Sequence, residues 1–118
     1  MNNYNAILAA LANIKVKKGK TITLYATLTD PNNSNLPYDL SVFDSLESAC
    51  KRWPSDSTYL WQKTLSYTGA DNNILIIPLT PVETDLVTGK YFWDVIGLIG
   101  VEETPVIEGD YIIQASVQ

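Results

Sequence analysis

The chain has 118 residues, of which 46% are hydrophobic and 18% are charged, and its net charge is −5. This length and composition indicate one globular domain and exclude a disordered tail, while the negative charge argues against a nucleic-acid partner. No apolar run approaches the ~20 residues of a membrane-spanning helix, so no membrane partner is expected.

The residue types present restrict the chemistry. Histidine is absent, which excludes a Ser-His-Asp triad, a Cys-His dyad and an imidazole metal site. Cys50 is the only cysteine, so an internal disulfide is impossible and we expect a small core residue. No phosphate-binding glycine loop or marked carboxylate pair is present. The sequence therefore predicts a protein that is not an enzyme and that holds no cofactor or metal.

The first segment, residues 1–13, contains an apolar stretch from Ala6 to Ala12 that is followed by lysines. A secretory signal carries its positive charge before the apolar stretch, so we expect this segment to belong to the mature protein, made in the cytoplasm. Two helical turns and an arm that orders only in an assembly are both compatible with it. We predict an N-terminal arm or short helix over 1–13 and one β-domain over 14–118.

The clearest strand covers residues 21–29, where apolar and polar residues alternate with period two. We expect one face to be half-buried, with Ile22, Leu24, Ala26 and Leu28 pointing inward. The loop that follows has oxygen-bearing residues at calcium-loop spacing (Asp30, Asn32 and Ser34), but Asn35 and Ser41 stand where such a loop needs Gly and Glu. We therefore predict a plain turn.

Residues 43–53 are compatible with two structures. Apolar residues keep a helical spacing, and Asp44 with Glu47 would form a capping box. Alternatively, the segment is a strand with Leu46, Ser48 and Cys50 on one face. Residues 58–67 are predicted to be its hairpin partner, and residues 69–73 close the next turn.

The most informative stretch runs from Ile74 to Val95. A strand over 74–79 is followed by a short turn over 80–88 and by a second strand over 90–96. We predict that Tyr91, Trp93 and Val95 face the core, and that Tyr91 forms a tyrosine corner, in which the hydroxyl bonds the backbone a few residues upstream.

Further strands are predicted at 104–107 and 110–117, the latter with Ile113, Ala115 and Val117 inward. Seven or eight short strands separated by turns indicate an antiparallel β-sandwich.

Several of these strands are apolar on both faces, whereas a sheet with one wet face should alternate cleanly. Either the N-terminal segment or another subunit is expected to cover the outward residues. The candidate interface residues are Ile74, Ile76, Phe92, Ile96 and Ile112.

Tyr59 and Trp61 lie on one face of their strand and form a candidate platform for stacking on a sugar. Because tryptophan is largely buried on average, burial of Trp61 is the favoured interpretation.

Charge is distributed unevenly. Residues 1–29 carry four lysines and no acid, and residues 92–118 carry five acids and no base. Ordinary surface charge explains this. A second interpretation is head-to-tail docking of one subunit's basic start onto another's acidic end.

The pattern resembles the small Ig-like β-sandwich domains of bacteriophage tail, baseplate and fibre structural proteins, such as the N-terminal domain of baseplate upper proteins. The matching positions are Gly19 and Thr21, Asp39-Leu40, Leu79-Thr80, Leu86, Gly89-x-Tyr91-x-Trp93-Asp94 and Gly109.

The resemblance implies an all-β, single Ig-like antiparallel β-sandwich and favours a strand over residues 43–53. It also implies a structural component of a virion that forms a homo-oligomer and docks other virion proteins. The alternative function is a stand-alone module that binds carbohydrate or a cell surface on the same sandwich.

Overall fold

The computed structural model describes residues 10–11, 13–30 and 36–116, and within them the chain is mostly β-strand with two short helical turns. The helical turns are η2 (Leu40–Val42) and α1 (Pro81–Thr84). The strands are β1 (Ala10–Leu11), β2 (Ile14–Lys17), β3 (Ile22–Thr27), β4 (Thr29–Asp30), β5 (Leu36–Pro37), β6 (Ser45–Lys51), β7 (Trp61–Thr68), β8 (Ile74–Leu79), β9 (Gly89–Ile99) and β10 (Glu102–Gln114).

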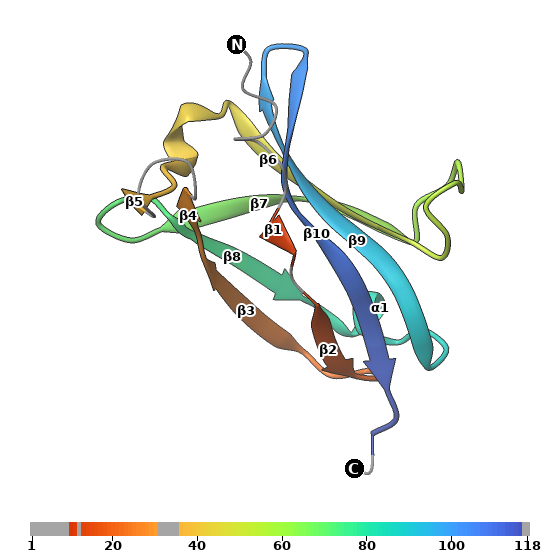
Figure 1. Cartoon of the computed structure of the whole chain (residues 1–118). Coiled ribbons are helices and arrows are strands. Elements are labelled where there is room, and N and C mark those ends of the chain that lie inside the picture. Colours follow the sequence, from red (N-terminus) through yellow and green to blue (C-terminus); the bar gives the residue numbers. More distant parts are fainter. Residues whose placement is uncertain (1–9, 12, 31–35, 117–118) are drawn as a thin grey trace.

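The strands form a sandwich-like, all-β fold. The main sheet has the order β1-β10-β9-β6-β7-β8-β3, with β2 also paired to β10, and β4 and β5 form a separate ribbon. Strand β7 belongs to both layers: its first half pairs with β6 and its last three residues pair with β8. In Figure 1 the pair β3 and β8 lies to one side of the pair β9 and β10, and β7 runs from one to the other. The buried core residues come from both layers.

The N-terminal segment contributes an edge to the sheet. Strands β1 and β2 both run parallel to β10 and keep one register, with Ala10 opposite Ile107 and Ile14 opposite Tyr111. Between them, the side-chain oxygen of Asn13 accepts a hydrogen bond from the Asp110 backbone N–H at 3.0 Å. The predicted arm over residues 1–13 therefore includes a strand at Ala10–Leu11; residues 1–9 lie outside the described part of the chain.

The predicted alternation of β9 is confirmed, because Tyr91, Trp93 and Val95 are buried. The Tyr91 hydroxyl donates to the Val87 carbonyl at 2.6 Å, as a tyrosine corner requires. The same alternation holds in β8, where the buried residues are Leu75, Ile77 and Leu79.

Residues 45–51 form strand β6, so the helical alternative for this segment is wrong. Leu46, Ser48 and Cys50 are buried on its inner face. Asp44 caps no helix; its carboxylate accepts the Gly100 N–H at 2.8 Å. Period-two burial decides the structure here because the segment is held between two neighbouring strands, β7 and β9.

The C-terminal predictions need a correction. Strand β10 is one 13-residue strand that continues through residues 108–109, where the sequence predicts a break, and its irregularity lies earlier, between Pro105 and Ile107. The bulge lets the chain pass a proline without leaving the sheet. Ile113 is buried as predicted, but the strand ends at Gln114, so Ala115 is exposed. Val117 lies outside the described residues.

The strand predicted over residues 21–29 is β3 followed by β4. Its inward face is only partly covered: Leu28 is buried, whereas Ile22 is 36% exposed. The reason is position, because β3 is the last strand in the order of the main sheet. The oxygen-bearing loop that follows includes residues 31–35, which lie outside the described part of the chain, so the plain turn stays a prediction there.

Candidate functional site

The candidate site is a hollow of about 440 Å³ on the outer face of β6, β9 and β10. Because Tyr91, Trp93 and Val95 point inward, the alternate residues of β9 point outward. These are Phe92, Asp94 and Ile96, and all three line the hollow. The register places Glu108 beside Asp94 and Asp94 beside Ala49, so the centre of the hollow is a row across three strands.

The lining is strongly acidic. It contains one basic residue, Lys51, and five carboxylates, contributed by Glu47, Asp94, Glu103, Glu108 and Asp110. Within the described residues, none of the five carboxylates takes part in an ion pair. Desolvation in the hollow raises the pKa of Asp94; Lys51 opposes that shift, and repulsion from Glu108 and Glu103 adds to it. The carboxylates therefore act on one another electrostatically.

Aromatic residues form one end of the hollow. Tyr59 and Phe92 line it, and the Lys51 ammonium lies over the Tyr59 ring at 4.9 Å from its centroid. Trp53 is 53% exposed and packs against Phe92 with a centroid separation of 6.3 Å. This end offers ring faces, and it also includes a carboxylate, because Asp110 lies opposite Phe92 in the register.

The structure divides the five predicted interface residues between two surfaces. Phe92 and Ile96 line the hollow, and Ile112 lies on the same outer face of β10, one outward position beyond Asp110. Ile74 and Ile76 lie on the outer face of β8, in the other layer. All five are half-buried.

The predicted sugar platform is not assembled. Tyr59 is 49% exposed, but Trp61 is buried at 8% and makes an edge contact with Tyr111 at 5.6 Å between ring centroids. Trp61 opposes Cys50 in the register, so it shares the inward face of the sheet. The favoured interpretation, burial of Trp61, is confirmed, and Phe92 takes its place as the second ring beside Tyr59.

Sequence analysis did not identify the acidic hollow as a site. The signal is the excess of acids after residue 92, which the sequence analysis interprets as ordinary surface charge or as one side of a head-to-tail contact, without placing the acids on one face. Applying the period-two pattern to those acids would have placed Asp94 beside Phe92 and Ile96 on one outward face. Glu47 joins the site from a distant strand, which only the pairing of β6 with β9 reveals.

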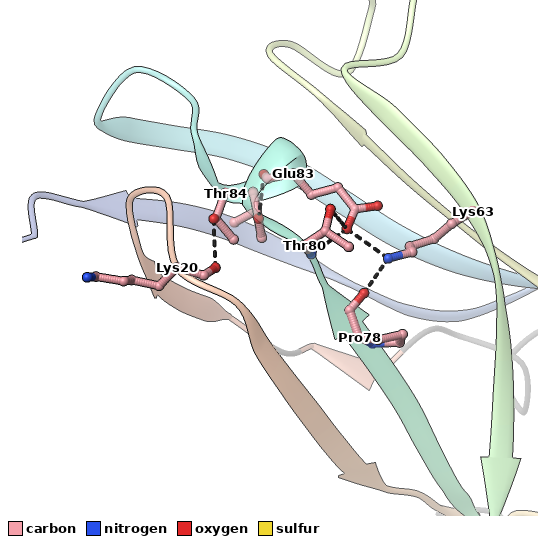
Figure 2. A network of polar contacts seen from close by, with 7 residues as sticks. Lys20, Lys63, Pro78, Thr80, Glu83 and Thr84 are labelled. Carbon is pink, nitrogen blue, oxygen red and sulfur yellow. Dashed lines mark hydrogen bonds and ion pairs between the residues drawn. The ribbon is translucent and has the colours of Figure 1, made fainter.

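A second polar cluster lies around α1, and it holds the fold together (Figure 2). The Lys63 ammonium contacts the Glu83 carboxylate at 2.8 Å, with side-chain exposures of 17% and 13%, and also donates to the Pro78 carbonyl. Glu83 accepts the Thr80 N–H at 2.8 Å, which completes a capping box. Burial alone would raise the pKa of Glu83, but the bonds from Lys63 and Thr80 outweigh it and lower the pKa.

The same cluster joins α1 to both layers. The buried Thr84 hydroxyl donates to the Lys20 carbonyl at 2.8 Å, and the Tyr111 hydroxyl donates to the Glu83 carbonyl at 2.9 Å. Each of these polar atoms has a protein partner, so the cluster offers nothing to a ligand.

The described residues offer neither a metal-binding cluster nor a reactive thiol. They contain no group of three or more acids, cysteines or histidines placed to hold a metal ion. Cys50 is fully buried, and desolvation raises its pKa to about 12, which disfavours the reactive thiolate. The described part of the chain has no helix long and apolar enough to cross a membrane.

Comparisons with known proteins give matches among solved structures alone. No protein-family model and no curated protein match the chain. Among solved structures, it is similar to NK cell receptor Nkp44, a triggering partner in natural cytotoxicity, with 12% identity and a TM-score of 0.42. That match covers 92% of this chain and 99% of the receptor chain. A likeness at this level says nothing of this chain's ligand or partner.

Proposed function

We propose that this chain is a non-enzymatic structural domain of a bacteriophage virion, in a tail, baseplate, fibre or connector. In this proposal it is an Ig-like sandwich that acts by self-association and by docking other virion proteins. The tyrosine corner at the start of β9 and the two layers joined by β7 support the Ig-like arrangement. The phage context comes from the resemblance of the sequence.

The observation that carries the proposal is the outer face of β6, β9 and β10. Phe92 and Ile96 lie half-exposed in its hollow, and Ile112 lies half-exposed on the same face, beyond Asp110. Apolar residues gathered in this way on an otherwise polar face mark a protein contact. Burying them would contribute roughly 25 cal/mol per Å² of apolar surface.

Two measurements test the proposal. Antibody labelling of purified particles of the encoding phage should place the chain in the virion. Light scattering after size exclusion should give a mass above that of one chain, and Phe92→Ser with Ile96→Ser should lower it. The matched control is Val101→Ser, at a residue that is 96% exposed in the β9–β10 turn. A monomer that is absent from the particles would overturn the proposal.

A carbohydrate-binding module is the second candidate, because Tyr59 and Phe92 present rings beside carboxylates in one hollow. Stacking on rings and hydrogen bonding to hydroxyls would both be available to a sugar there. Binding on a glycan array that is lost in Tyr59→Ala, with a monomeric chain, would favour this candidate.

A further inference from the structure

The structure contains a basic feature that complements the acidic hollow. The lysine turn, Lys17–Lys20, joins β2 to β3 at one end of the molecule (Figure 1). The Lys18 ammonium bonds the Asp85 carboxylate at 2.9 Å and the Leu86 carbonyl at 3.0 Å. Gly19 has a φ of +75° and donates its N–H to the Thr84 carbonyl at 3.2 Å. The turn is therefore fixed in shape by the loop that holds α1.

Two lysines of the turn face the solvent. Lys17 and Lys20 are exposed, and neither takes part in an ion pair within the described residues. Figure 2 shows the Lys20 side chain directed away from the polar cluster while its carbonyl accepts from Thr84. The turn thus presents two exposed ammonium groups, and its backbone is held in place by the loop around α1.

The turn cannot reach the hollow of its own chain. Lys17 lies opposite Gln114, which is four residues along β10 from Asp110, the nearest residue of that strand that lines the hollow. At 3.4 Å a residue this separation is roughly 14 Å, which is beyond the reach of a lysine side chain. Contact between the two features therefore requires two molecules.

We infer that the acidic hollow of one copy receives the lysine turn of a second copy. This inference rests on the proposed self-association and names the surfaces that carry it. The two surfaces are different parts of the molecule, so the contact is heterologous. Repeated contacts of this kind close into a ring or continue as a tube.

Charge and shape favour this occupant. The hollow has four more acids than bases, since it holds five carboxylates and one ammonium. Entry of two ammonium groups relieves the repulsion among Asp94, Glu103 and Glu108, whereas an uncharged sugar leaves it in place. A volume of about 440 Å³ accommodates the side chains of a turn.

A charge-swap experiment tests the contact. The turn variant is Lys17→Glu with Lys20→Glu, and the hollow variant is Asp94→Lys with Glu108→Lys. The control is Asp71→Lys with Glu102→Lys, at exposed residues outside the hollow. Association is measured by light scattering and sedimentation over a concentration series, at low and high salt, with circular dichroism to show that each variant folds.

We expect each charge-swap variant alone to associate at least about tenfold more weakly than the wild type, and the control to be unchanged. An equimolar mixture of the two variants should regain association, because each glutamate turn then meets a lysine-lined hollow. High salt should weaken the wild-type contact about tenfold as well, since it screens exposed charges.

The possible results separate the inference from the proposed function. A wild-type monomer at every concentration, or failure of the mixture to associate, overturns the inference. Oligomers that persist unchanged in both variants also overturn it, but they leave self-association through the apolar face intact. Loss in each variant with recovery in the mixture supports the lysine turn as the occupant.

Discussion

Two regions of the molecule contain several charged residues. They are the polar cluster around α1 formed by Lys63, Glu83 and Thr84, called here the α1 corner, and the outer face of β6, β9 and β10. The charged groups have different surroundings in the two regions. In the α1 corner, Lys63, Glu83 and Thr84 each have a protein partner within 3 Å. On the outer face, five carboxylates line a hollow, and three half-exposed apolar residues lie in it or next to it. None of the five carboxylates forms an ion pair within the described residues. The charged groups of the α1 corner are therefore paired within the chain, whereas the carboxylates of the outer face form no ion pair within the described residues.

This difference distinguishes polar groups that stabilise the fold from charged groups that are expected to bind a partner. A buried polar group that is fully bonded costs little and holds the chain in one arrangement. Like charges that gather on an unpartnered face cost stability and are expected where a partner of opposite charge relieves them. Substitutions in the corner should therefore change stability, while substitutions on the face should change association.

The largest effect is expected from Glu83→Ala, which leaves the Lys63 ammonium without its partner and removes the cap of α1. The loss should be about 2–4 kcal/mol of unfolding free energy, because breaking a largely buried pair strands a charge. Urea denaturation measures it, with Val82→Ala, at an 84% exposed residue of the same helix, as control. A loss below about 0.5 kcal/mol would assign the corner no structural role.

Gly97→Ala should come next, since it disturbs the layer directly behind the hollow. A Cβ added at Gly97 would lie 2.4 Å from Cδ1 of the buried Phe43 ring. Overpacking of this kind costs about 1–3 kcal/mol. Thermal denaturation should show the loss, and adding Phe43→Leu should recover part of it. If the double variant is no more stable than Gly97→Ala, the ring contact is not the cause.

Tyr91→Phe should have a smaller effect, because it removes one hydrogen bond from the tyrosine corner. The Val87 carbonyl would lose its 2.6 Å donor, at a cost of about 1 kcal/mol. Denaturation of Tyr25→Phe provides the control, since Tyr25 is 65% exposed. Equal stability of the two variants would show that the hydrogen bond from Tyr91 to Val87 contributes nothing to the free energy of unfolding.

The sequence predicted what depends on local alternation. The inward residues of β8 and β9 follow from period two, and the tyrosine corner follows from Tyr91 lying just after a turn. These features need only the chain's own neighbours, so the pattern is sufficient to find them.

What the sequence did not predict depends on contacts between distant segments. The parallel pairing of β1 and β2 with β10 joins residues about a hundred positions apart, and no local pattern encodes it. The continuity of β10 through Pro105 depends on a bulge against β9. The hollow combines Glu47 of β6 with Glu108 of β10, so it exists only once the strand order is known.

The smallest effect is expected on the outer face, where Asp94→Asn should stabilise the chain by about 0.5 kcal/mol at neutral pH. The pKa of Asp94 is raised above its ordinary value, chiefly by desolvation and further by Glu108 and Glu103. A carboxylate whose folded pKa is raised costs stability at every pH above that pKa. Solvent screening at this exposed residue keeps the gain small.

The pH dependence gives this last prediction its sign. The cost of ionising Asp94 disappears as the pH falls through its raised pKa, so the advantage of Asp94→Asn should shrink in acid and vanish below about pH 3.8. Glu83 behaves in the opposite way: its lowered pKa contributes stability above about pH 4.5, which is lost as acid protonates it.

Thermal melts of wild type, Asp94→Asn and Glu83→Gln from pH 7 to pH 3 would measure both trends. If Asp94→Asn destabilises the chain at pH 7, the carboxylate is satisfied by its own chain. The charged groups of the outer face would then be paired within the chain, like those of the α1 corner, and the proposed difference between the two regions would be wrong.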